Sequence, residues 1–223
     1  MAILCKTIHA LRAVGTFGRT LRKNRKGTAV LEFALIGPAF IALLLAILYT
    51  MMIYLAQQML ETAAESSGRL LLTGIAQTTT QANGTVGMSA SDFKNAICNG
   101  ASGTNASGQA VAIPPLLPPM LSCSRLTVNV SVATSYNVAS TSAPTFAYDS
   151  NGVLVSTGSG YNYQSSGSGK NRIIVLQLIY LWPTGKGPLG LNLINEPNAN
   201  RKLVATSVFT TEDYSCNASQ TSC

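Results

Sequence analysis

The longest apolar pattern in the chain is a run over residues 33–56, interrupted only by Gly37, Pro38, Thr50 and the tyrosines. At about 1.5 Å per residue, a helix over this run is about 36 Å long, enough to cross a hydrocarbon core of about 30 Å. A cleaved secretory signal has a shorter apolar core of about 7–15 residues, followed at once by a small-residue cleavage site. The run therefore predicts one membrane-spanning helix.

Apolar residues continue beyond this run at three- and four-residue steps, which is typical of one face of a helix. They are Leu55, Ala56, Met59, Leu60, Ala63, Ala64, Leu70 and Leu71. Gly74 is suited to ending the helix. We therefore expect one helical segment over residues 28–77, membrane-spanning at first and amphipathic towards its end.

Shorter patterns follow in the rest of the chain. Ser89 with Asp92 three residues later is typical of a capping box, which would open a short helix that ends at Cys98. Residues 125–136 and 202–212 alternate apolar and polar side chains, as half-buried strands do. Residues 172–182 are apolar on both faces, as expected of a central strand.

The polar segments between these patterns are expected to be linkers and loops. Residues 78–87 are predicted to form a linker, a Gly/Ser/Pro loop is expected from Cys98 to Cys123, and residues 137–170 a long loop with a small hairpin turning at 150–152. Three strands and an amphipathic helix predict the α+β class, with a small antiparallel sheet laid across the long helix.

Charge is unevenly distributed along the chain. The seven charged residues before Gly27 are all basic, and from Thr28 onward eight basic residues balance eight acidic ones, so the net charge of +7 belongs to residues 1–27. Basic residues beside a span favour the cytoplasmic side, which places the residues after about Gln57 outside. A basic arm that adjoins an apolar span favours a membrane role over nucleic-acid binding. We therefore predict a leader over 1–27, a helix over 28–77 and an exported head over 78–223.

Residues for catalysis or metal binding are sparse. The only histidine, His9, lies in the leader, which removes histidine-dependent catalytic and metal sites from the exported part. We predict no enzyme activity, no cofactor and no metal. Four exported cysteines permit two disulfides in three connectivities, and sequence proximity favours Cys98–Cys123 and Cys216–Cys223.

One carboxylate, Glu32, lies at the start of the apolar run. Burying it at membrane depth costs at least a few kcal/mol unless it is paired, which makes it a functional candidate; a position in the head-group zone is the simpler alternative. Gly27 follows the basic block, Glu32 is the fifth residue after it, and Phe33 comes next.

This arrangement resembles the type IV prepilin processing site, where a membrane peptidase cuts after glycine and the fifth mature residue is glutamate. The resemblance implies cleavage between Gly27 and Thr28. It also implies assembly roles for Thr28, Glu32 and Phe33, with the freed Thr28 amine pairing with Glu32 of a neighbouring subunit.

More specifically, residues 25–74 are similar to the TadE-like proteins of the tight-adherence (Flp-type) pilus system. The resemblance extends through GMSASDFKNAIC, LSCSRLTVNV, RIIVLQLIYLWPTGKGPLGLNL and RKLVATSVF, and it spans residues 26–209. Phe33 stands where tyrosine is common, and the loop over 137–170 and the Cys216/Cys223 pair are departures. The resemblance implies a pilin-like fold and a minor pilin, or pseudopilin, that starts or caps the pilus.

The resemblance also implies partners and a location. The partners are prepilin peptidase, the major Flp-type pilin, other minor pilins, the inner-membrane assembly platform and membrane lipid. The location is the bacterial inner membrane, in a single pass with the N-terminus cytoplasmic and the C-terminal domain periplasmic, or the pilus itself. Two alternatives stay open: an uncut membrane-anchored adaptor of a secretion or pilus apparatus, and an anchored periplasmic hydrolase or sugar-binding protein.

Overall fold

The computed structural model describes residues 28–133, 135–162 and 173–212, and the chain divides into two compact units between Leu48 and Tyr49. Within the described residues, the first unit is the N-terminal part of helix α2. The second unit holds the rest of α2 and the strands. The predicted leader lies outside the described residues, and the predicted division between helix and head at residues 77 and 78 stays a prediction.

Helix α2 runs over Thr28–Leu72. In its first part, nearly all of the large apolar side chains are exposed. It is long and apolar enough to cross a membrane, and it is the one helix of this kind in the described part of the chain. Pro38 has no backbone N–H, so the carbonyl of Ala34 lacks its usual helical donor. The predicted single apolar helix is therefore confirmed.

From Ile53 onward, one stripe of α2 is buried. The stripe consists of Ile53, Ala56, Leu60, Ala63, Ala64, Ser67, Leu70 and Leu71. Leu55, expected on this face, is 41% exposed because it lies off the stripe. Gly74 follows the end of α2 with a φ of 75°, a left-handed conformation that glycine adopts without steric cost. It leads into a short helix that the sequence analysis did not predict, α3 (Ile75–Thr78).

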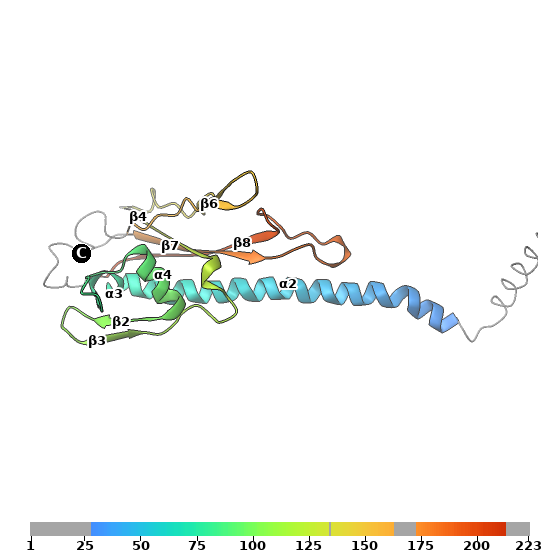
Figure 1. Ribbon diagram of the computed structural model, residues 1–223, viewed down its shortest axis with the longest axis horizontal. Helices are drawn as coiled ribbons and strands as arrows, with labels where there is room; N and C mark the ends of the chain where they lie inside the picture. The colour runs from blue at the N-terminus through green and yellow to red at the C-terminus, as the bar shows by residue number, and fades with distance from the viewer. Residues whose placement is uncertain (1–27, 134, 163–172, 213–223) are drawn as a thin grey trace, which may run out of the picture. The chain divides into compact units, whose positions relative to one another are not determined.

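The main sheet has three antiparallel strands in the order β4-β7-β8. They are β4 (Leu126–Ala133), β7 (Ile173–Pro183) and β8 (Asn200–Thr210), as predicted, with the doubly apolar strand in the centre. One face of the sheet forms the main core together with the stripe of α2. Figure 1 shows this sheet along one side of α2.

The other face of the main sheet is covered by residues 137–162. This segment contains the expected small hairpin, formed by β5 (Ala147–Tyr148) and β6 (Leu154–Ser156). The side chain of Gln177 on β7 is buried and donates to the carbonyl of Thr141 at 2.8 Å. Because both faces of β7 are covered, its continuous apolar pattern is accounted for.

A second, smaller sheet was not predicted. It has the order β1-β2-β3 and consists of β1 (Thr80–Gln81), β2 (Ala101–Thr104) and β3 (Ala110–Ile113). The linker and loop interpretations of these residues were therefore wrong in part. The strands have only two to four residues, and β2 and β3 contain alanine, glycine or serine, which have little preference for strands. Their antiparallel pairing therefore has no clear sequence pattern. In Figure 1 the β2–β3 hairpin lies on the side of α2 opposite β7 and β8.

Helix α4 (Ala90–Asn99) opens with the predicted capping box. The hydroxyl oxygen of Ser89 accepts from the backbone N–H of Asp92 at 3.2 Å, and the Asp92 carboxylate accepts from the backbone N–H of Ser89 at 3.1 Å. Hydrogen bonds from the Ser89 hydroxyl and the Gln81 amide lower the pKa of Asp92. Phe93, Ala96 and Ile97 of this helix complete the main core.

Candidate functional site

The segment expected to carry processing and assembly is only partly described. Gly27 lies outside the described residues, and Thr28 is the first residue of α2. Glu32 follows one turn later, on the same side of the helix as Thr28 by helical spacing. The side chains of Glu32 and Phe33 are exposed, that of Phe33 by 75%. The cleavage and assembly roles of these residues stay predictions.

Glu32 has no charged neighbour on its own part of the helix. The sequence contains no other charged residue from Thr28 to Met59, and the side chains beside it are exposed and apolar. Once lipid or another helix covers this surface, no other side chain of residues 28–59 can supply a cation to the carboxylate. The arrangement is thus suited to an intermolecular ion pair.

A disulfide links two of the predicted cysteines. Cys98 lies near the end of α4, Cys123 opens the short helix η2 (Cys123–Arg125), and their Cα atoms are 5.7 Å apart. This is the pairing that sequence proximity favours. Both residues pack against the main core, so the bond ties α4 to the start of β4 and encloses β2 and β3. Cys216 and Cys223 lie outside the described residues.

The connection between β7 and β8 is attached to α2 at two points that the sequence analysis missed. The hydroxyl of Tyr49 donates to the carbonyls of Thr184 and Gly185, the latter at 3.2 Å. The amide nitrogen of Gln57 donates to the carbonyl of Val204 at 2.9 Å. The start of the connection and strand β8 are therefore fixed to residues 49–57 of α2.

The approach of this connection to α2 depends on a small residue. A Cβ atom on Gly187 would lie 3.3 Å from the ring of Tyr49 and 3.0 Å from the carbonyl oxygen of Leu191. A larger residue would therefore push the connection away from the helix. The three glycines and the proline of the segment TGKGPLG are typical of a loop, but no sequence pattern predicts its contact with Tyr49.

The fold defines a class of protein: an α+β head built on the second part of a long apolar helix, whose first part is suited to a membrane. Residues 27–69 match the family model described as TadE-like protein, so this segment of the chain is similar to the TadE-like family. Proteins of that family are associated with the Tad pilus. Comparison with curated proteins and with solved structures gives no match.

The disulfide yields a stability prediction. Replacing Cys98 and Cys123 together by serine is expected to lower the free energy of unfolding by about 3–4 kcal/mol, because the bond closes a loop with a sequence separation of 25. Denaturant unfolding of the detergent-solubilised chain, followed through the fluorescence of Trp182, measures this change. Serine at Cys216 and Cys223 is the matched control and should cost less, because its loop is shorter. Free thiols at Cys98 and Cys123 in a non-reducing peptide map would contradict the pairing.

Proposed function

We propose that this chain is a minor pilin, or pseudopilin, that starts or caps an Flp-type pilus. The observation that carries the proposal is the division of α2. Its first part exposes an apolar surface, as a helix that packs beside other apolar helices or lipid must do. Its second part is covered by a folded head. The match of residues 27–69 to the TadE-like family supports the same role.

The size of the head favours a few copies over a repeating subunit. The major pilins of this system, by family resemblance, consist of little more than the apolar helix. Packed helices lie about 8–10 Å apart, and a folded head of this size, repeated at that spacing, would collide with its neighbours. A few copies at one end of the filament avoid the collision. We propose no catalytic role.

The proposed location is the bacterial inner membrane, with the leader in the cytoplasm and the head in the periplasm, or the pilus after assembly. The seven basic residues before Gly27 support this orientation. The proposed partners are prepilin peptidase, the major pilin, other minor pilins and the assembly platform. Cleavage after Gly27 would remove the basic leader and leave the Thr28 amine as the cation nearest to Glu32 in the sequence.

The role itself is tested by the composition of the filament. Deleting the protein should abolish pili while the major pilin is still made and processed. Purified wild-type filaments should contain this chain only in traces, because a few copies suffice to start or cap a fibre. Quantitative mass spectrometry of the filaments measures the ratio. Equal amounts of this chain and the major pilin would contradict the proposal.

Processing is tested by the mass of the mature chain. With prepilin peptidase present, the membrane-extracted protein should begin at Thr28. Replacing Gly27 by leucine should leave the leader attached, because the peptidase needs a small residue where it binds the backbone. Gly18→Leu, also in the leader, is the control and should be cut normally. A full-length wild-type chain would favour the uncut adaptor.

The proposed pairing is tested at Glu32. A Glu32→Ala variant should be inserted and cleaved, because removing a carboxylate makes insertion easier, but it should not support pili. Glu65→Ala is the matched control, since Glu65 is an exposed carboxylate on the part of α2 that carries the head. Counting pili by electron microscopy, with the processed chain quantified in parallel, separates the two effects. Normal piliation in Glu32→Ala would remove Glu32 from the mechanism.

A further inference from the structure

A groove of about 490 Å³ lies between α2 and the beginning of β8. Residues of α2, the β7–β8 connection and β8 line it: Thr50, Ile53, Tyr54, Gln57, Leu193, Arg201, Lys202, Leu203 and Val204. Ile53 and Leu203 belong to the main core, so the base of the groove is apolar. Its remaining wall carries hydroxyl, amide and cationic groups. The groove is therefore suited to an amphipathic ligand.

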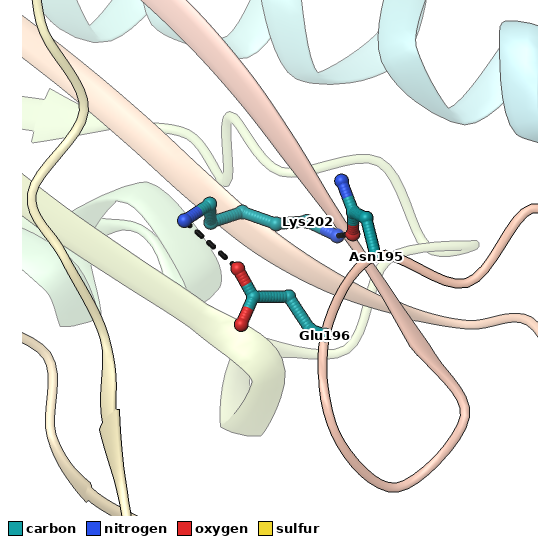
Figure 2. A network of polar contacts seen from close by, with 3 residues as sticks. All are labelled: Asn195, Glu196 and Lys202. Atoms are coloured by element: carbon teal, nitrogen blue, oxygen red, sulfur yellow. Dashed lines mark hydrogen bonds and ion pairs between the residues drawn. The ribbon is translucent and has the colours of Figure 1, made fainter.

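The charge of Lys202 is already compensated. Its ammonium nitrogen lies 2.8 Å from a carboxylate oxygen of Glu196 and 5.2 Å from the centroid of the Phe146 ring. Its backbone N–H donates to the side-chain oxygen of Asn195 at 2.7 Å. Figure 2 shows the contacts of Lys202 with Asn195 and Glu196, which fix the end of the connection to the start of β8. The ammonium group of Lys202 is thus engaged in contacts within the protein.

Arg201 is different, because its charge is not compensated by the described residues. One terminal nitrogen donates to the carbonyl of Leu193 at 3.1 Å, and the buried Nε has no hydrogen-bond partner among the described residues. The Glu61 carboxylate of α2 accepts from the side-chain amides of Gln57 and Gln58. A guanidinium group binds phosphate through several parallel N–H donors, so Arg201 supplies the cation of a phosphate site.

Along the sequence of α2, the residues that line the groove begin where a segment of membrane-spanning length ends. A hydrocarbon core is crossed by about 20 helical residues, and this number counted from Phe33 ends near Met52. Met51 and Tyr54 occupy the same turns as the groove and are 60% and 68% exposed. Tyrosine is enriched at this boundary between hydrocarbon and water. Tyr54, which lines the groove, is therefore suited to contact with lipid head groups.

We infer that this groove binds the head group of an anionic phospholipid. The phosphate lies against the Arg201 guanidinium, and the glycerol and first methylene groups lie along Ile53 and Leu203. An anionic lipid is favoured over a zwitterionic one, because a choline or ethanolamine head group brings its own cation to Arg201. The inference rests on the membrane anchor of the proposed function, but not on cleavage or on a role in pili.

The chain contains its own reporter for this site. Trp182 is the only tryptophan in the sequence, and it is the cross-strand partner of Arg201 in the main sheet. Directly opposite residues on one face of an antiparallel pair have Cβ atoms about 4.5–5.5 Å apart. A lipid bound at Arg201 therefore lies close enough to Trp182 for a spin label near its head group to quench the fluorescence.

The experiment reconstitutes the full chain into phosphatidylcholine vesicles with a minor fraction of phosphatidylglycerol. One of the two lipids carries a spin label high on its acyl chain, at equal mole fraction in paired samples. Labelled phosphatidylglycerol should quench Trp182 with about fivefold higher apparent affinity, as expected for one cation near an anionic leaflet. Arg201→Gln should reduce this preference to near one, and Arg201→Lys should keep most of it. Lys94→Gln, which removes a cation from α4, is the matched control and should keep all of it.

The remaining outcomes separate the possible failures. Equal quenching by the two lipids in the wild type, or an unchanged preference in Arg201→Gln, overturns the site. Loss of the preference in excess inorganic phosphate would show a free-phosphate site and overturn the assignment to lipid. Extraction of the chain by alkaline carbonate would instead show that the proposed anchor has failed. A carbonate-resistant chain without lipid preference overturns only the present inference.

Discussion

The contact between the buried stripe of α2 and the main sheet is the interaction on which the rest of the head depends. Small residues on the helix set its spacing: a Cβ atom on Gly68 would lie 3.2 Å from the ring of Phe209 and 3.3 Å from the hydroxyl of Ser207. Close approach lets Leu60 and the alanines of the stripe pack against the inner face of the sheet, and burying such apolar surface is the main driving force of folding. The ties at Tyr49 and Gln57 extend the same contact along α2.

The outer face of the sheet follows a different rule. There a buried polar side chain, Gln177, accepts from the amide of Asn129 at 2.8 Å and donates to the carbonyl of Thr141. Leaving a buried amide without its hydrogen-bond partner costs about 1–3 kcal/mol of stability. These bonds therefore stabilise the covering segment and also select one position for it. At the hairpin turn of the segment, the side chain of Asn198 donates to the carbonyl of Gly152 at 2.6 Å. The inner face is thus defined by shape, whereas on the outer face hydrogen bonds act together with the burial of Val175 and Ile179.

An element of the fold could be predicted from the sequence when it is stabilised by the burial of side chains, and not when it is stabilised by backbone pairing. Helix α2, the capping box at Ser89 and the three strands of the main sheet have side-chain patterns that match their burial, so the sequence predicts them. The strands β1, β2 and β3 are held by backbone pairing between small residues, which leaves no pattern to recognise. The charge of Arg201, which the described residues do not compensate, could not be predicted either, because the alternation of Arg201 with Leu203 suggests only a strand. The groove beside it forms where β8 meets a helix about 150 residues earlier in the sequence.

The candidate site could be predicted only where its residues are close together in the sequence. Gly27, Thr28, Glu32 and Phe33 form a motif in sequence, but the partner that would give Glu32 its role belongs to another molecule. By contrast, the stripe of α2 finds its partner within the chain. The TadE-like match covers residues 27–69, which includes both the exposed part of α2 and nearly all of the stripe, and ends before the head strands. The likeness to the family therefore resides in the helix, which must serve two surfaces at once. The properties particular to this chain, including the groove at Arg201, are supplied by the head that the helix carries.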